Sequence, residues 1–433
     1  MYYIGVDIGT SSICGVAYNP ETRETITVTR ENTFSIPADS DDEKLQDPDR
    51  ITDCVAEIIG ELTAGRHDVA SIGMTGQMHG ILYVDRDGHA VSPLFTWQDG
   101  RGNRPMADGM SYAEFLTANS SYHLATGYGL VTHFYNLRNG LVPAAASRLC
   151  TIMDYAVMKL TGRRTPMTDY SNAGALGFFD CMELQFDKQA IASAGIDCAI
   201  LPDIAPSAVI AGFFNDIPVH SAIGDNQASF IGSVADKATS VLLTVGTSSQ
   251  ISVYSPRYVQ LPGMDTRPLP GGGYILVGAE LCGGYSFTIL KNFFRETARL
   301  ICGMELSDND IYTAMTSVSL TEHDTLNVET LFDGTRQDPG KRGKITGIST
   351  SNFLPQELIS GFARGICEAL HGYYTQLPPE LREHKKQIVA SGNGFRKNHL
   401  LRQAAEATFN LPLHLTPSTE EAAFGAALSP LLP

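Results

Sequence analysis

The stretch GVDIGTSSICGV, Gly5–Val16, is matched far downstream by LLTVGTSSQISV, Leu242–Val253. In both copies a run of β-branched and apolar residues precedes Gly-Thr-Ser-Ser, and a second such run follows it. Two β-rich runs joined by a short glycine-containing turn predict a β-hairpin. The sequence therefore predicts two similar hairpins, one in each half of the chain.

Such a turn is suited to binding phosphate. Glycine permits a close approach, and hydroxyls and successive N–H groups can donate to phosphate oxygens. Asp7 has no acidic counterpart in the second copy, where Thr244 stands. A carboxylate beside a phosphate needs a divalent cation between them, and a largely hydrated Mg²⁺ suits this arrangement. Either two unrelated hairpins share a turn sequence, or the chain contains a duplicated domain whose hairpins face each other across a cleft.

Composition narrows the classes of partner. The 433 residues are 43% hydrophobic and 18% charged, as in a folded protein with room for two or three domains. The net charge of -16 and the lack of a basic block argue against a nucleic-acid partner. No signal peptide, membrane-spanning run or paired cysteine motif is evident. We therefore expect a cytoplasmic protein, with PADSDDEKLQDPDR at 37–50 as a solvated acidic loop.

Two neighbouring motifs are suited to binding hydroxyl groups. GQMHG, Gly76–Gly80, offers the donors and acceptors of Gln77 and His79, and WQDGR begins at Trp97, the only tryptophan. Sugars are held by an aromatic face together with polar groups, here Asp99 and Arg101. The alternative is a buried polar turn beside a core tryptophan.

Two further motifs lie in the later part of the chain. In HSAIGDNQASFIGS, 220–233, Asp225 precedes a run of small residues that suggests the start of a helix. From the residues alone, Asp225 is either a functional carboxylate or a helix N-cap. In IVASGNGFRKNHLL, 388–401, a glycine-rich turn joins a β-rich run to a helix-like run, a junction that can hold phosphate or adenosine. A plain turn is the alternative reading of this second motif.

Taken together, these stretches resemble the FGGY carbohydrate kinases of the actin/hexokinase/Hsp70 superfamily. The resemblance runs nearly end to end and includes the closing EEAAFGAAL, Glu420–Leu428. It implies an α/β fold with two ribonuclease-H-like domains flanking a nucleotide cleft. Residues 1–232 would form an N-terminal domain with the sugar site and catalytic base, and residues 233–433 a C-terminal nucleotide-binding domain.

The resemblance also implies roles for individual residues. Asp225 would be the general base that accepts the proton of the attacking hydroxyl, and Asp7 would orient Mg²⁺. The sugar would contact the residues of the GQMHG, WQDGR and GDN motifs: Gln77, Met78, His79, Trp97, Asp99, Arg101, Asp225 and Asn226. ATP would contact the two turns and the later glycine motif: Gly9, Thr10, Ser11, Gly246, Thr247, Ser248, Gly392, Asn393, Gly394 and Asn398.

The implied reaction is ATP-dependent phosphorylation of a ketose on its terminal hydroxyl. Gln98 makes the motif W-Q-D-G-R, which resembles sedoheptulokinases, whereas xylulokinases usually have W-N-D. Sedoheptulose is therefore the expected substrate, and D-xylulose the alternative. A non-catalytic ATP-binding sugar sensor and an actin-like filament protein are more distant alternatives. The family also suggests a homodimer, and it gives Arg336 either a place near the nucleotide or a surface ion pair.

Overall fold

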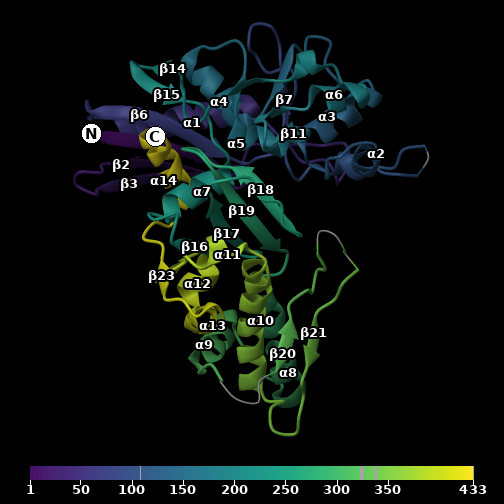
Figure 1. Ribbon diagram of the computed structural model, residues 1–433, viewed down its shortest axis with the longest axis vertical. Helices are drawn as coiled ribbons and strands as arrows, with labels where there is room; N and C mark the ends of the chain where they lie inside the picture. Colours follow the sequence, from purple (N-terminus) through teal and green to yellow (C-terminus); the bar gives the residue numbers. More distant parts are fainter. Residues whose placement is uncertain (108, 322–325, 336–337, 339, 433) are drawn as a thin grey trace. The chain divides into compact units, whose positions relative to one another are not determined.

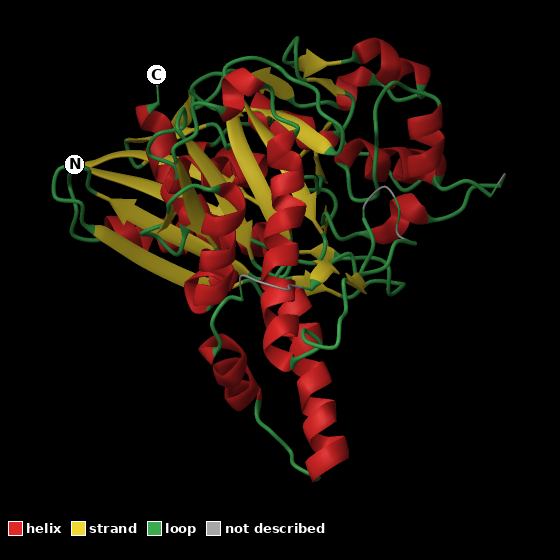
Figure 2. Ribbon diagram, turned by 60° about the horizontal axis from the view of Figure 1, so that its bottom comes forward, coloured by secondary structure: helices red, strands yellow, loops and turns green. Residues whose placement is uncertain are grey.

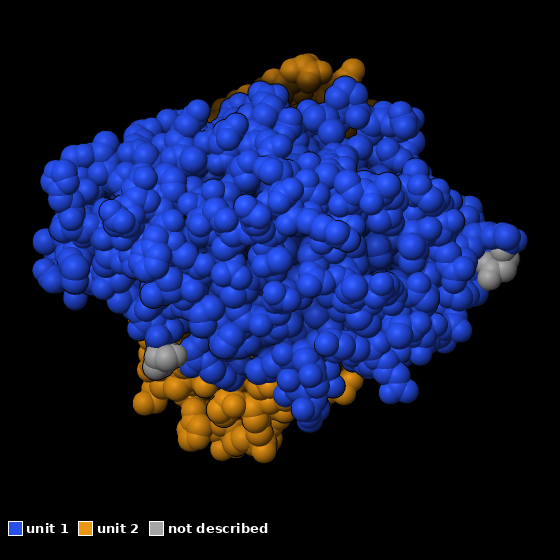
Figure 3. All heavy atoms as spheres, turned by 90° about the horizontal axis from the view of Figure 1, so that it is seen from above, with its two compact units in different colours: residues 1–232, 267–273, 420–433 blue, residues 233–266, 274–419 orange. Residues whose placement is uncertain are grey.

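The computed structural model describes residues 1–107, 109–321, 326–335, 338 and 340–432. The chain forms two compact units (Figure 3). The first contains Met1–Gly232, Arg267–Gly273 and Glu420–Pro433, and the second contains Ser233–Thr266 and Tyr274–Thr419. One division falls at the boundary expected after residue 232, while two short later segments belong to the first unit. The separate roles expected for the two domains stay predictions.

The first unit is built on a six-stranded mixed sheet of order β14-β15-β6-β1-β2-β3 (Figure 1). β1, Tyr2–Ile8, pairs antiparallel with β2, Ser12–Tyr18, and parallel with β6, Val69–Gly76. These strands form because their apolar residues are buried on both faces of the sheet.

Helices cover the two faces of this sheet. α1, Pro48–Thr63, begins with Pro48 after Asp47, whose carboxylate accepts from the backbone N–H of Asp49 and Arg50. Its apolar residues share a core with β1, β2 and α4, Ile152–Thr161. On the other face α14, Glu421–Leu428, packs against β1 and β6. Figure 2 shows helices lying against the strands in this way.

The second unit has a six-stranded sheet of order β18-β19-β17-β16-β22-β23. β16, Ser240–Val245, pairs antiparallel with β17, Ser249–Ser255, and parallel with β22, Gln387–Ser391. The order β19-β17-β16-β22-β23 repeats the order β3-β2-β1-β6-β15, with the same strand directions. This shared topology favours the duplicated domain over chance similarity of two turns.

Both predicted hairpins are confirmed, but their registers differ. In the first hairpin Ile8 pairs with Ile13, which leaves four residues in the turn. In the second Val245 pairs with Ser249, which leaves three. The two Gly-Thr-Ser stretches therefore occupy equivalent places in the two sheets, although their hydroxyl groups are not equivalently placed.

The remaining elements of the two units complete the layers. In the first unit they are β3 Thr25–Glu31, β4 Ser35–Ile36, β5 Leu45–Gln46, β7 Leu82–Val84, β8 Leu94–Phe95, η1 Gly100–Asn103, α2 Tyr112–Ala118, α3 Gly129–Arg138, β9 Arg148–Cys150, β10 Met167–Asp169, α5 Tyr170–Ala173, η2 Gly174–Leu176, β11 Phe179–Asp180, β12 Gln185–Phe186, α6 Lys188–Ser193, η3 Cys198–Ile200, β13 Asp203–Ala205, β14 Ile210–Phe214, β15 Ile217–His220 and η4 Ser429–Leu431. α7, Asp225–Ser233, ends at the boundary of the units. In the second unit they are β19 Tyr274–Glu280, α8 Tyr285–Cys302, α9 Asp308–Ser317, β20 Asn327–Glu329, β21 Lys344–Thr346, α10 Pro355–Thr375, α11 Pro379–Arg382, α12 Asn393–Lys397, α13 His399–Phe409 and β23 Leu413–Leu415, with β18 Met264–Pro268 spanning a boundary.

The described helices include none that is both long and apolar enough to cross a membrane.

The contact of α14 with the sheet predicts the effect of a glycine substitution. A Cβ at Gly73 would collide with the backbone of Ala426, so Gly73→Ala should lower the free energy of unfolding by about 2 kcal/mol. Gly60 in α1 is the matched control, because a Cβ there meets nothing within 4 Å. Gly60→Ala should raise the free energy of unfolding by about 0.5–1 kcal/mol. Urea unfolding measures both, and an equal stability of the two variants would contradict this packing.

Candidate active site

The first Gly-Thr-Ser turn contacts both hydroxyl-binding motifs. The indole Nε1 of Trp97 donates to Thr10 Oγ1 at 2.9 Å, and Thr10 Oγ1 lies 3.4 Å from Gln77 Oε1. Gln77 is buried and donates through Nε2 to Gln46 Oε1 at 2.8 Å, while Gln46 Nε2 donates to the Thr10 carbonyl at 3.1 Å. The fold therefore brings together Thr10, Gln77 and Trp97, which are far apart in the sequence.

Three carboxylates of the first unit interact electrostatically. Burial, together with the negative charges of Asp225 and Glu420, raises the pKa of Asp7 to about 7. Burial also raises the pKa of Asp225, against the opposing effects of the Arg267 charge and hydrogen bonds from Asn226. Asp225, the expected base, therefore lies close enough to Asp7, the expected Mg²⁺ ligand, for its charge to disfavour the ionised form of Asp7.

Local hydrogen bonds fix the start of α7. Asp225 is the first residue of this helix, so it does not take the N-cap position. The backbone N–H of Gly224 donates to Ser171 Oγ at 3.1 Å, and Gln227 Nε2 donates to the Ser171 carbonyl at 3.0 Å. Asp169 in turn caps the helix that carries Ser171. Gly224, before Asp225, and Gln227, after it, are thus both bonded to Ser171, which fixes the position of Asp225 between them.

The carboxylates suit a hydrated cation better than a fully protein-coordinated one. Among the described residues no group of three or more His, Cys, Asp or Glu side chains could hold a metal ion. Asp7 nevertheless lies near two other carboxylates whose charges disfavour its ionised form. A divalent cation held mainly by water and by phosphate oxygens would offset this repulsion.

The GQMHG motif follows β6 directly. His79 has a φ of 75°, Nδ1 lies 2.9 Å from the Ala175 carbonyl, and the ring stacks on Tyr128 at 4.7 Å. Met78 is buried beside Gly224, where a Cβ would collide with the Met78 side chain. The motif is thus packed against the loop that carries Asp225.

The WQDGR motif divides into an exposed and a buried part. Trp97 is 46% exposed, whereas Asp99 and Arg101 are 0% and 3% exposed. Arg101 Nε donates to Asp99 Oδ1 at 2.5 Å, and Arg101 Nη1 donates to Asn136 Oδ1 at 2.7 Å. The Asp99–Arg101 pair therefore holds the loop that presents Trp97. The expected contacts of Asp99 and Arg101 with a sugar stay predictions.

A cavity of about 420 Å³ adjoins this loop. Thr10, Thr96 and Gln98 line it together with residues of the acidic segment 35–46. The segment is fixed to its surroundings, because Arg104 donates to the carboxylates of Asp42 and Glu43 at 2.8 and 2.9 Å. Part of the acidic loop expected at 37–50 thus lines a cavity beside Gln98, and residues 37–41 are exposed to solvent.

The second Gly-Thr-Ser turn is surrounded by backbone of its own unit. The N–H of Gly283 donates to the Thr247 carbonyl and the N–H of Gly284 donates to the Gly246 carbonyl, both at 2.9 Å. A Cβ at Gly283 would collide with Ser248. By contrast, a Cβ at Gly246 would meet nothing within 4 Å. The turn is held from one side by the residues that precede α8, and Gly246 faces open space.

The later glycine motif adjoins the same turn. Gly392 has a φ of 87°, and a Cβ at Gly392 or Gly394 would collide with Val245, the last residue of β16. Asn393 begins α12, and Asn398 caps α13 by accepting from the N–H of Leu400 at 3.0 Å. The described contacts therefore group Gly392 and Gly394 with Gly246, whereas Asn398 has a capping role. Contacts of all these residues with adenosine stay predictions.

The sequence analysis did not single out two glycines beside the second turn or Glu420 near Asp7 in the first unit. Gly283 and Gly284 form a Gly-Gly pair between a strand and a helix, a pattern that can indicate a phosphate site. Glu420 influences the pKa of Asp7, but the two residues are so distant in sequence that no local pattern links them. Arg336, which was expected either near the nucleotide or in a surface ion pair, lies outside the described residues.

Comparison with known proteins identifies the family and the fold. The model of the FGGY family of carbohydrate kinases, N-terminal domain, matches residues 2–242. Sedoheptulokinase of Mus musculus is 29% identical over 420 residues, covering 88% of this chain and 86% of that protein. Xylulose kinase of Lactococcus lactis is 24% identical over 444 residues, covering 96% and 84%. The crystal structure of Plasmodium falciparum glycerol kinase with ADP superposes with a TM-score of 0.80 at 18% identity, covering 99% and 88%, and shows the same fold.

The carboxylate interaction predicts a shift in the titration of Asp7. Asp225→Asn removes a neighbouring negative charge, so the pKa of Asp7 should fall from its value of about 7 in the metal-free protein. NMR titration of carboxyl-labelled aspartate measures this pKa. Asp85→Asn is the control and should leave it unchanged, because Asp85 does not influence Asp7. An unaltered Asp7 titration in Asp225→Asn would refute the interaction.

Proposed function

The chain belongs to the FGGY family of carbohydrate kinases, and we propose that it transfers the γ-phosphate of ATP to the terminal primary hydroxyl of sedoheptulose, giving sedoheptulose 7-phosphate. The observation that carries the proposal is the convergence in the first unit of Asp7, Asp225 and the Thr10 turn. The alternative substrate is D-xylulose. The expected homodimer stays a prediction from the family.

Asp225 is the general base in this proposal. Burial raises its pKa above the ordinary value of an aspartate, which makes its carboxylate a stronger proton acceptor. The Arg267 charge and the Asn226 hydrogen bonds still favour the ionised form that a base requires. Asp225 accepts the proton of the sugar hydroxyl as its oxygen attacks the γ-phosphorus, and ADP leaves.

The two Gly-Thr-Ser turns bind the phosphates in this proposal. Thr10 presents a hydroxyl, and Gly246 leaves space for a phosphate oxygen close to the backbone. The start of α8 adjoins the second turn, and a helix N-terminus favours a negative charge. Bound Mg²⁺ would neutralise charge on the phosphates, with Asp7 as the carboxylate that orients it.

The sugar lies against the exposed face of Trp97 in this proposal. Gln77, Met78, His79 and Asn226 surround it, and the buried Asp99–Arg101 pair keeps the tryptophan loop in place. An aromatic face with nearby polar groups is suited to a polyhydroxylated carbon chain.

Two observations favour sedoheptulose over D-xylulose. The sequence identity to the mouse sedoheptulokinase is 29%, against 24% to the xylulose kinase of L. lactis. Gln98, the residue that resembles sedoheptulokinases, also lines the cavity beside Thr10, and in this proposal the cavity accepts the additional carbons of the longer sugar. Both kinds of relative cover most of the chain, so the xylulose alternative is the one that the experiments must separate.

The assignment of Asp225 predicts a selective loss of turnover. Asp225→Asn keeps the shape but cannot accept the proton, so kcat should fall by about 10²–10⁴-fold. Equilibrium binding of ATP should stay near normal, because Asp225 acts on the sugar. Exposed Asp87→Asn is the control. Retention of most of the kcat in Asp225→Asn would overturn the proposed base.

The open space at Gly246 predicts an effect on ATP without an effect on folding. Gly246→Ala adds a methyl group that meets no protein atom, so thermal stability should stay unchanged. The methyl group would displace phosphate oxygens from the backbone and weaken ATP binding about tenfold or more. Gly372→Ala in α10, also open, is the control for ATP affinity. Normal ATP affinity in Gly246→Ala would exclude this turn from the phosphate site.

The position of Gln98 predicts a change in specificity. Gln98→Asn removes one methylene from the cavity wall and should shift the ratio of kcat/KM values about tenfold towards D-xylulose. Steady-state kinetics with sedoheptulose and D-xylulose measure the ratio, and exposed Gln260→Asn is the control. An unchanged ratio would remove Gln98 from the determinants of specificity.

A further inference from the structure

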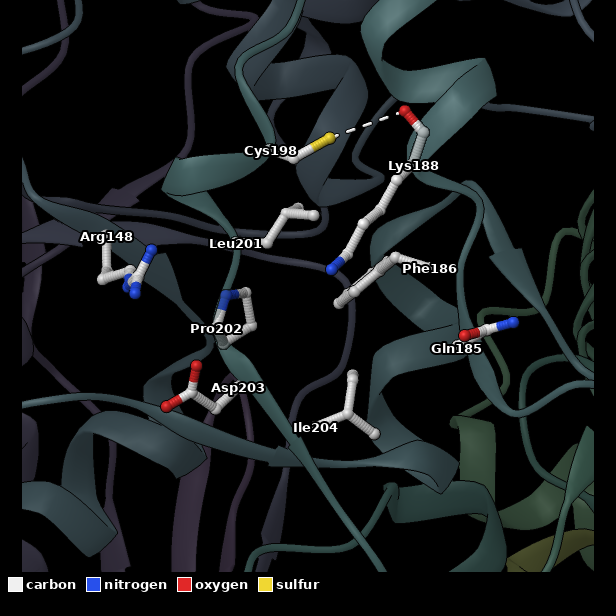
Figure 4. A pocket seen from close by; sticks show the side chains of 9 residues that line it. All are labelled: Arg148, Gln185, Phe186, Lys188, Cys198, Leu201, Pro202, Asp203 and Ile204. Atoms are coloured by element: carbon white, nitrogen blue, oxygen red, sulfur yellow. Dashed lines mark hydrogen bonds between the residues drawn. The ribbon is translucent and has the colours of Figure 1, made fainter.

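The first unit contains a second cavity, of about 500 Å³, that no expected site residue lines (Figure 4). Its walls come from β9, β12, η3, β13 and the start of α6. A volume of this size is within the range of small-molecule sites. The sequence motifs give no role to this part of the chain.

Two cationic side chains line this cavity, and neither has an ion-pair partner among the described residues. Within the described part of the chain, neither Arg148 nor Lys188 forms a salt bridge. Arg148 Nη1 donates to the carbonyl of Ala199, and no hydrogen bond involves the Lys188 ammonium among the described residues. Figure 4 shows that Lys188 extends past Phe186 into the middle of the lining residues.

Two cations and one carboxylate, that of Asp203, line this cavity in a chain that is acidic overall. With 47 acidic and 31 basic side chains, carboxylates are in excess. Arg104 in the same unit, by contrast, has two carboxylate partners. Two unpaired cations on one concave surface favour an anion with two or more charged oxygens, and the guanidinium fork suits phosphate.

The rest of the lining describes the body of the ligand. Phe186, Leu201 and Pro202 are buried and form an apolar wall, with Ile204 partly buried beside them. Asp203 and Gln185 are exposed at the lining and can accept hydrogen bonds from hydroxyl groups. The Asp203 carboxylate would repel a second anionic group. The lining therefore suits one phosphate attached to a hydroxylated carbon chain.

We propose that this cavity binds a small phosphorylated polyol, with its phosphate held by Arg148 and Lys188 and its hydroxyl groups near Asp203 and Gln185. The carbon chain lies against Phe186, Leu201 and Pro202. The site is separate from the residues assigned to catalysis, so it does not depend on which sugar the kinase phosphorylates.

Isothermal titration with D-glucose 6-phosphate tests this site in the full chain. The wild-type protein should bind the probe, and Lys188→Gln should weaken binding about tenfold, because it removes one charged donor. Lys188→Arg keeps the charge and should largely restore binding. Arg148→Gln should weaken binding similarly. Exposed Arg86→Gln is the matched control for the loss of a positive charge and should bind normally.

Titrations with other ligands and with another variant identify the ligand and the place of binding. Inorganic phosphate should bind more weakly than the ester and D-glucose more weakly still, because each lacks part of the complementary surface. Gly246→Ala should bind the ester normally. Absence of binding to the wild-type protein, equal binding by Lys188→Gln, equal affinity for phosphate and ester, or loss of binding in Gly246→Ala would each overturn the proposal. ATP turnover is measured separately, so failure here leaves the proposed function untouched.

Discussion

The first unit depends on a contact between backbones that no side chain separates. Gly5 and Gly73, on β1 and β6, lie directly against the backbone of α14, and Gly425 of α14 lies against Ala228 of α7. A Cβ at any of these glycines would collide with backbone. Because glycine has no Cβ, α14 can pack closely against both β1 and α7. Asp7 lies next to the last residue of β1, and Asp225 is the first residue of α7. The last residues of the chain thus hold the two aspartates in one site.

The repeated topology has been adapted differently in the two units. The first turn is accompanied by Asp7 and lies beside Trp97, so this unit offers a carboxylate for a cation and a surface for a sugar. The second turn has Thr244 instead and adjoins the start of α8 and the Gly392 motif. Glycines surround this second turn, and the open space at Gly246 would let a phosphate approach its backbone. One supersecondary arrangement therefore supplies two complementary environments.

Sequence alone was sufficient where the signal is local. Both hairpins could be read from β-rich runs and turn glycines, and the closing EEAAFGAAL was recognised through its resemblance to the family. Other features depend on long-range packing and could not be read. The one-residue difference in hairpin register, the position of Glu420 near Asp7, and the cavity formed by the acidic segment beside Gln98 are examples. The buried Asp99–Arg101 pair illustrates that residue types suited to a sugar can also be satisfied within the protein.

The most direct test of the account is the release of ADP from Mg-ATP by the purified chain, measured as kcat/KM for sedoheptulose, D-xylulose, L-xylulose, D-ribulose, L-ribulose and glycerol. The account predicts sugar-dependent ADP release with the highest kcat/KM for sedoheptulose. A preference for D-xylulose would contradict the role of Gln98 and assign the enzyme to the pentulose. Binding of ATP with no sugar-dependent release from any of these substrates would contradict the kinase mechanism itself.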